Sequence, residues 1–179
     1  MSIYTKKGDD FYTRASDGSL LKKDDKLICA TGLIDEMAAS LAFAISMLKS
    51  EEEKYSAKPP FYVGDLVGDL KKIIKHICAM DFASGANETM DVGFLEEKID
   101  SFEKVLPKLD GFLMPGESPG AASLNLCRVD VRRCERELIS LLGERLSKSI
   151  RQYINRLSDY LFCAMRLAMY LRDEREISI

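Results

Sequence analysis

Residues 25–49 read DKLICATGLIDEMAASLAFAISMLK, and this stretch decides the fold class. Apolar side chains recur along it at the 3.6-residue spacing of an α-helix, at Leu27, Ile34, Met37, Leu41, Ala44, Ile45 and Leu48. A helix with one apolar stripe needs a partner surface that buries the stripe. We therefore expect a long helix that packs against other helices.

Four further segments carry the same pattern. We expect helices over about 63–86, 93–106, 119–142 and 147–175, with Ser118 as the N-cap of the 119–142 helix and Pro119 in its first turn. Residues 1–24 lack helical periodicity and predict an N-terminal loop with a short strand at Ile3–Thr5. Five amphipathic helices joined by short connections predict an all-α, antiparallel five-helix bundle.

The composition is that of a single domain spanning residues 1–179. With 46% hydrophobic and 31% charged residues, the chain lacks the bias of long disordered segments. Its net charge of −3 lacks the basic surplus of non-specific nucleic-acid binders, so we expect no nucleic-acid partner. No apolar run reaches the ~18 residues of a membrane span, and the polar start at Ser2–Asp10 is unlike a signal peptide. We expect a cytoplasmic protein with no membrane partner.

The cysteines and the histidine exclude several kinds of site. The five cysteines form no CxxC pair and lie in apolar helical stretches, so we expect buried, reduced thiols. His76 is the single histidine of the chain, which excludes a histidine-rich metal site and a two-histidine catalytic pair. We expect His76 on a helix surface.

The 119–142 helix carries four arginines. Arg128, Arg132 and Arg136 are spaced by four residues and form one stripe, whereas Arg133 lies beside it. One interpretation is a solvated face with local ion pairs to Asp130 and Glu135 on the same helix. The other is a clamp for a polyphosphate, because guanidinium groups match phosphate oxygens in pairs.

Two other helices place polar groups near apolar faces. Asn155, Asp159 and Phe162 share a face of the 147–175 helix, where Asn155 could belong to a buried polar network or could orient a ligand. Gly32 lies inside the 25–49 helix, which suggests close approach of a backbone or a ligand. Asp35 could form an ion pair with an arginine of the 119–142 helix.

The N-terminal loop has the residue types of an anion-holding loop. Gly8 permits close backbone approach, and Thr5, Lys6 and Thr13 can donate hydrogen bonds. The phosphate-binding pattern GxxxxGK[ST] does not occur, so a nucleotide site in this chain is not a P-loop.

Together these segments resemble the PduO-type ATP:cob(I)alamin adenosyltransferases over nearly the whole chain, and in one order. The most specific matches are Arg128-Val-Asp-Val-Arg-Arg-Cys-Glu-Arg136, similar to RxxxRRAER, and Asn155-Arg-Leu-Ser-Asp-Tyr-Leu-Phe162, similar to NRLSDY(L/F)F. Shorter matches are Ile3-Tyr-Thr-Lys, Lys23-Asp-Asp25, Gly32-Leu-Ile-Asp-Glu-Met37 and Phe112-Leu-Met-Pro-Gly116.

The resemblance implies a homotrimer of five-helix bundles with active sites between subunits. It implies transfer of the 5′-deoxyadenosyl group of ATP to Co(I) of cob(I)alamin, with release of triphosphate. The expected small molecules are ATP, Mg²⁺ with the nucleotide, and the reduced corrinoid. Because the cobalt is the nucleophile, the protein would position the substrates and stabilise the leaving group.

The resemblance also assigns residues. ATP would be held by the N-terminal loop and by the two long helices, through Thr5, Lys6, Gly8, Asp9, Thr13, Lys23, Arg132, Glu135 and Asn155. Asp35 and Arg128 would pair across a subunit interface beside the corrinoid. Phe112 would press on the lower face of the corrinoid and disfavour an axial ligand, which makes Co(II) easier to reduce to Co(I). The resemblance supports no assignment of protein ligands to a metal.

Several positions depart from the family pattern. They are Lys7, Asp10 and Phe11 in the loop, Thr31, Glu117, and Asn125 in place of a common histidine. Phe11 replaces a glycine, and Asp10 adds negative charge beside an anion site. These changes favour an alternative function, that of a non-catalytic relative that binds corrinoid or nucleotide for delivery or regulation. A ligand-free helical scaffold is the second alternative.

Overall fold

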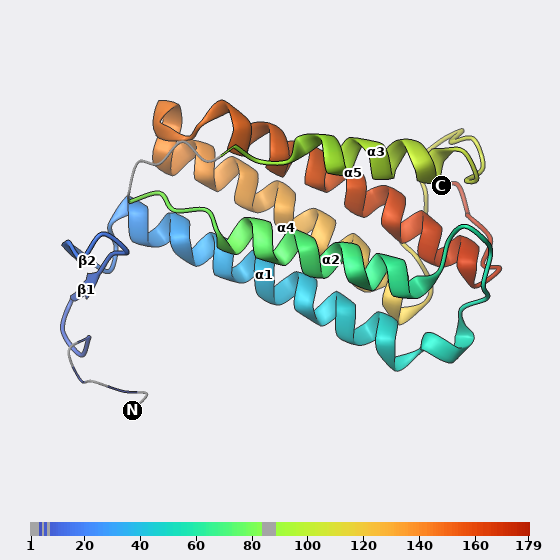
Figure 1. The fold of residues 1–179 in the computed structure, drawn as a ribbon, viewed down its shortest axis with the longest axis horizontal. Coiled ribbons are helices and arrows are strands. Elements are labelled where there is room, and N and C mark those ends of the chain that lie inside the picture. The colour runs from blue at the N-terminus through green and yellow to red at the C-terminus, as the bar shows by residue number, and fades with distance from the viewer. Residues whose placement is uncertain (1–3, 5, 7, 84–88) are drawn as a thin grey trace.

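The structure is a computed structural model that describes residues 4, 6, 8–83 and 89–179. Five α-helices make up most of this part of the chain (Figure 1), and the all-α prediction is confirmed. Their bounds are α1 Lys26–Ser50, α2 Val63–Cys78, α3 Val92–Glu103, α4 Pro119–Leu142 and α5 Lys148–Leu171. The 3₁₀ turns η1 Glu52–Lys54 and η2 Gly143–Arg145 follow α1 and α4, and the strands β1 Tyr12–Arg14 and β2 Leu20–Lys22 precede α1.

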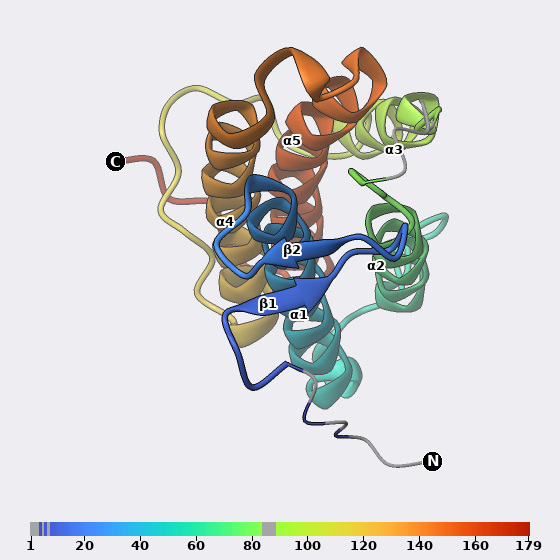
Figure 2. The ribbon, with the colours of Figure 1, turned by 90° about the vertical axis from the view of Figure 1, so that its left-hand side faces the viewer.

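The helices lie side by side, and successive helices run in alternating directions, as the colour sequence in Figure 1 shows. α4 packs between α1 and α5, while α2 packs mainly on α1 and α3 mainly on α5. Seen from the end, the β-hairpin lies across the start of α1 (Figure 2). The faces of α4 and α5 are therefore positioned by the most extensive helix contacts of the fold.

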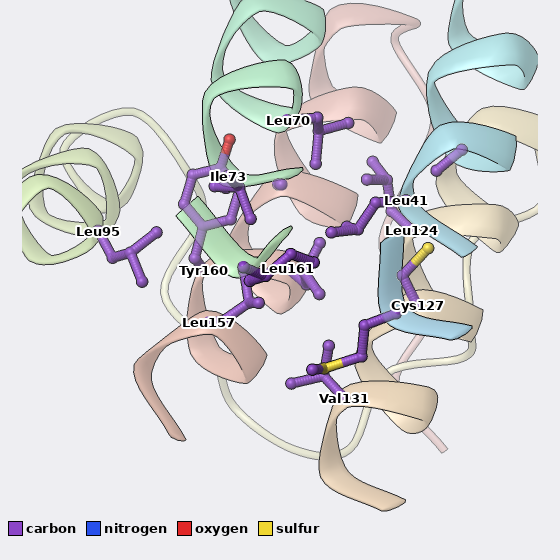
Figure 3. Packing of buried hydrophobic residues seen from close by; sticks show 14 of the residues in the cluster. Leu41, Leu70, Ile73, Leu95, Leu124, Cys127, Val131, Leu157, Tyr160 and Leu161 are labelled. Atoms are coloured by element: carbon purple, nitrogen blue, oxygen red, sulfur yellow. The ribbon is translucent and has the colours of Figure 1, made fainter. Parts of the chain in front are cut away.

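The core lies where these helices meet (Figure 3). Leu41, Ile73, Leu124, Leu157 and Tyr160 are fully buried and come from four different helices. Full burial of one such aliphatic side chain contributes about 1.5–3 kcal/mol. The apolar stripe predicted from residues 25–49 is thus a core face of the bundle.

Local capping explains the helix starts. The side chain of Asp25 accepts a hydrogen bond from the Leu27 amide at 2.9 Å, and Ser147 accepts one from the Ile150 amide at 3.2 Å. Pro119 occupies the first turn of α4, as predicted. Ser118 stands at the N-cap position, but its hydroxyl donates to Glu174 at 3.1 Å and caps no amide. The prediction that Ser118 is the N-cap residue is confirmed, although its side chain caps no amide.

Three helices end earlier than predicted, and of these α3 ends at Glu103 and not at residue 106. α2 ends at Cys78 and not near residue 86, because the amides of Ala79 and Met80 bond three residues back to His76 and Ile77 and tighten the last turn. The apolar residues after Cys78 continue the 3.6-residue spacing, but they lie outside the helix. α5 ends at Leu171 and not at residue 175.

The end of α5 is a Schellman motif. Asp173 adopts a left-handed conformation with φ of 57°, its amide bonds to Tyr170, and the amide of Glu174 bonds back to Met169. The backbone then leaves the helix and runs on as an extended tail.

The N-terminal loop contains a short hairpin that the sequence did not predict. β1 and β2 pair antiparallel with Thr13 opposite Leu21, and Gly18 has φ of 83° in the connecting turn. Strands of three residues are too short to show a periodicity. The strand predicted at Ile3–Thr5 lies largely outside the described residues.

The expectations for thiols and histidine are corrected in part. Cys127, Cys134 and Cys163 are buried, but Cys29 and Cys78 are exposed. Burial raises the pKa of the Cys127 thiol to about 11, which keeps it protonated. His76 is half-buried, with Nδ1 3.1 Å from the Tyr153 hydroxyl, so it is not a simple surface residue.

One helix, α1, is long enough and apolar enough to cross a membrane by length and composition alone, although no such run was expected. Its buried face packs against α2 and α4, and it carries Asp35 and Glu36. A core helix of a bundle passes the same test, so this signal carries little weight.

Candidate active site along α4 and α5

The arginine stripe of α4 pairs with no carboxylate in the part of the chain that the structure describes. Nε of Arg128 donates to Oδ1 of Asn125 at 2.9 Å, and Arg136 donates to the carbonyl of Arg132 at 2.9 Å. None of the ion pairs among the described residues involves Arg128, Arg132 or Arg136. Burial, followed by the charge of Arg132, lowers the pKa of Arg128. The stripe is therefore a row of positive charge that is open to an external anion.

The acids expected to offset the stripe have other partners. Asp130 accepts a hydrogen bond from Ser40 at 2.9 Å, and Glu135 accepts one from Nδ2 of Asn155 at 3.0 Å. Arg133 alone fits the interpretation of local ion pairs, because it contacts Glu36 and Glu137. The local ion-pair interpretation is thus wrong for the stripe.

Asn155 joins α5 to α4 beside this stripe. Its amide is exposed, so it does not belong to a buried polar network, and its contact with Glu135 fixes where it lies. Asp159 is paired instead with Arg156 at 2.7 Å, and Arg156 also reaches Glu96 of α3. Glu135 and Asn155 are brought together as the resemblance implied, whereas Asp159 belongs to the contact with α3.

Phe112 lies at one end of the stripe. Its ring is 84% exposed and lines a pocket of about 570 Å³. The same pocket is lined by Arg128 and Asn125 of α4 and by Phe162 and Met165 of α5. An apolar hollow therefore adjoins the row of guanidinium groups. Sequence reasoning missed Met165 as a site residue, although it lies three positions after Phe162 on the same helix.

The α1 residues behave differently from what was expected. Asp35 is exposed and takes part in no ion pair among the described residues, whereas its neighbour Glu36 pairs with Arg133. Among the described residues of this one chain, Asp35 therefore forms no ion pair with α4, and its pairing with Arg128 across subunits stays a prediction. A Cβ at Gly32 would meet nothing within 4 Å, so no backbone of this chain approaches it closely.

The N-terminal loop is organised around Lys23. Its ammonium group donates to the carbonyl of Gly8, and its amide donates to the carbonyl of Phe11 at 2.8 Å. Asp9, Asp10, Phe11 and Lys23 line a pocket of about 630 Å³. Lys6 is exposed, Thr13 lies half-buried in β1, and Thr5 and Lys7 are outside the described residues.

Residues 8–23 of the loop lie apart from the arginine stripe. No hydrogen bond or ion pair joins residues 8–23 to Arg132, Glu135 or Asn155, and the hairpin projects from the end of the bundle (Figures 1 and 2). The candidate residues therefore fall into two groups, one on the hairpin and one along α4 and α5, which are called half-sites below.

Comparison with known proteins identifies the family of this chain. The family model described as cobalamin adenosyltransferase matches residues 3–168. The chain belongs to the cobalamin adenosyltransferase family. A corrinoid adenosyltransferase of Bacillus subtilis is 33% identical to this family member over 177 residues, covering 93% of this chain and 86% of the relative. The human corrinoid adenosyltransferase MMAB is 28% identical, covering 97% of this chain and 71% of the relative.

Solved structures resemble the adenosyltransferase chain over its whole length. A variant PduO-type ATP:corrinoid adenosyltransferase from Lactobacillus reuteri, complexed with cobalamin and ATP, matches with a TM-score of 0.82 and 27% identity. The match covers 99% of this chain and 96% of that one. A second variant of that enzyme, complexed with ATP, matches with a TM-score of 0.80 and 29% identity over 99% of both chains.

Proposed function

We propose that this adenosyltransferase transfers the 5′-deoxyadenosyl group of ATP to Co(I) of cob(I)alamin and releases triphosphate. The observation that carries the proposal is the unpaired stripe of Arg128, Arg132 and Arg136. It runs between the Phe112 pocket and the Glu135–Asn155 pair, so a polyphosphate and an apolar-faced corrinoid can lie next to each other.

In the reaction, Co(I) donates an electron pair to the ribose C5′ carbon. A Co–C bond forms as the bond between C5′ and the triphosphate oxygen breaks, and the triphosphate leaves with that electron pair. Negative charge develops on the leaving oxygen, where the guanidinium of Arg132 stabilises it. No nucleophile from the protein is required, and the buried thiols of Cys127, Cys134 and Cys163 take no part.

The nucleotide is held from two sides. Arg132, Glu135 and Asn155 contact it from α4 and α5, and the loop supplies Thr5, Lys6, Gly8, Asp9, Thr13 and Lys23. Mg²⁺ accompanies the triphosphate, since this ion is bound through phosphates together with one or two protein carboxylates. The Glu135 carboxylate and the free amide oxygen of Asn155 are hard ligands of the right kind beside the stripe.

Phe112 covers the lower face of the corrinoid. Its ring stands free of its own chain in an apolar pocket, where it excludes an axial ligand from the cobalt. Loss of that ligand favours reduction of Co(II) to Co(I). Arg128, at the rim of the same pocket, pairs with Asp35 of a neighbouring subunit.

The active enzyme is a homotrimer with sites between subunits. Support comes from the separation of the two half-sites in one chain and from the absence of a partner for Asp35 among the described residues. Exposed apolar side chains on the outer faces of α1 and α4 also support the trimer. Phe43, Leu126 and Val129 are each about half exposed. The five free cysteines fit a reducing compartment such as the cytoplasm, and the site needs neither nucleic acid nor membrane.

The test is an anaerobic turnover assay with MgATP and chemically reduced cobalamin, followed by the absorbance of adenosylcobalamin. We expect stoichiometric product and triphosphate. Binding of both substrates without product would instead support the alternative of a delivery or regulatory protein, which the negative Asp10 and the bulky Phe11 beside the loop pocket favour. A thermal shift by neither MgATP nor cobalamin would indicate the scaffold.

A further inference from the structure

The segment that carries Phe112, residues 107–118, has little packing of its own. Most of its side chains are exposed, and only Gly116 and Ser118 near its end are buried. It connects α3 to α4 without regular structure. The orientation of the Phe112 ring must therefore be set by whatever holds the backbone of this segment.

The C-terminal tail, residues 172–179, holds that backbone. The amide of Met114 donates to the carbonyl of Ile177 at 2.7 Å, and the amide of Ile179 donates to the carbonyl of Phe112 at 2.8 Å. Leu113 and Ser178 form the antiparallel bridge between these two bonds. Phe112 thus sits in a short ladder whose second strand is the tail.

Side chains of the tail fix the segment at further points. The Ser178 hydroxyl donates to Asp110 at 3.0 Å, and Glu174 accepts from Ser118 at 3.1 Å. The tail is therefore joined to the segment before, at and after Phe112.

One buried arginine anchors this assembly. Arg166 of α5 is 4% exposed, and its guanidinium binds both carboxylate oxygens of Glu176, at 2.6 and 2.9 Å. The same guanidinium donates to the carbonyl of Pro107 at 2.6 Å, where the segment begins. A bidentate pair is the strongest and most directional form of ion pair, and removal of one partner leaves a buried charge unpaired.

We propose that Glu176, anchored by Arg166, is a positioning residue for Phe112. The tail strand sets where the Phe112 ring stands against the corrinoid, although Glu176 touches neither substrate. This inference rests on the proposed function, because it needs the corrinoid to lie in the Phe112 pocket. It adds that the ion pair behind the pocket controls the axial ligation of the cobalt.

The test uses two tail variants and a matched control. Glu176→Gln removes the charge that Arg166 binds, and Ile179→Pro removes the amide that donates to Phe112 while leaving the helices untouched. Asp173→Asn is the control, because it breaks the tail's ion pair with Lys58 and keeps a residue that tolerates the left-handed backbone. Circular dichroism and thermal unfolding verify that each variant is folded.

Two rates are compared for each protein, one starting from free Co(I) and one starting from Co(II) with a reductant. We expect both tail variants to lose at least 10-fold in the Co(II) rate and less than 2-fold in the Co(I) rate, with the control unchanged. The absorbance spectrum of bound Co(II) corrinoid should shift toward the axially ligated form. Glu176→Gln should add no further loss to Phe112→Ala.

Equal loss of both rates, or an unchanged Co(II) rate and spectrum in both tail variants, would overturn the positioning role. Failure of the proposed function gives a different result, since the wild-type protein would then form no adenosylcobalamin from free Co(I).

Discussion

At the scale of residues, Arg132 and Arg133 are neighbours on α4 with different surroundings. Arg133 is held by Glu36 and Glu137, whereas Arg132 takes part in no ion pair among the described residues. One helical step of about 100° separates the two side chains. Because of this step, Arg133 lies within reach of Glu36 and Glu137, whereas Arg132 forms no ion pair with them. The spacing of Arg128, Arg132 and Arg136 predicted the stripe, but it did not show which acids were already occupied.

Glu51 gives a residue-scale prediction about pH. Burial raises its pKa, but the hydrogen bond from Lys54 and the charge of Arg172 outweigh burial and lower the pKa below 4.5. A carboxyl group with a lowered folded-state pKa stabilises the protein above its unfolded pKa, and this contribution is lost as the pH falls through the folded value. We expect Glu51→Gln to be less stable at pH 7 and to lose less stability on acidification to pH 4. Urea unfolding at several pH values measures this, and parallel curves for both proteins would contradict it.

At the scale of elements, all five helix starts were predicted to within one residue, whereas the ends of α2, α3 and α5 were not. Asp25 and Pro119 act on their own first turns, so sequence is enough to locate the starts of α1 and α4. The end of α2 was missed because Met80 and Phe82 continue its apolar spacing past Cys78. The ladder between the tail and the Phe112 segment depends on chain reversal after α5, which no local pattern encodes.

Two glycines give an element-scale prediction about stability. A Cβ at Gly120, in the first turn of α4, would collide with the Tyr55 hydroxyl and press on Leu48, so Gly120→Ala should destabilise by about 1–3 kcal/mol. Gly68 lies exposed within α2, and a Cβ there would meet nothing within 4 Å. Gly68→Ala should therefore stabilise by about 0.5–1 kcal/mol. Denaturant unfolding of both variants checks the signs, and the same sign for both would refute the packing around Gly120.

At the scale of the whole molecule, the proposed active site consists of two parts, one on the hairpin and one along α4 and α5. The half-site on α4 and α5 was predicted from sequence, because its residues follow helical spacing and lie on two helices that pack together. The position of the loop relative to that half-site was not predictable from helical spacing, because under the proposed function it depends on the assembly of subunits. The proposed trimer joins the hairpin of one subunit to the arginine stripe of the next.

Subunit mixing tests this arrangement. Arg132→Ala removes the stripe contact, and Lys23→Ala removes the side chain that holds the loop, so each variant alone should be nearly inactive. When both are co-expressed in equal amounts, half of the stripes and half of the loops are intact, and about a quarter of the sites combine intact halves. We expect about a quarter of wild-type activity in the mixture. No recovery would show that each site is built within one chain.

The central claim is that the unpaired arginines of α4 hold the triphosphate of ATP. It is tested most directly by the MgATP affinity and turnover of Arg132→Ala beside the matched variant Arg133→Ala. Loss of the charge-assisted contact predicts that Arg132→Ala loses about 2 kcal/mol or more, roughly 30-fold, while Arg133→Ala stays close to wild type in MgATP binding. Wild-type binding and turnover in Arg132→Ala, or equal losses in both variants, would contradict the claim.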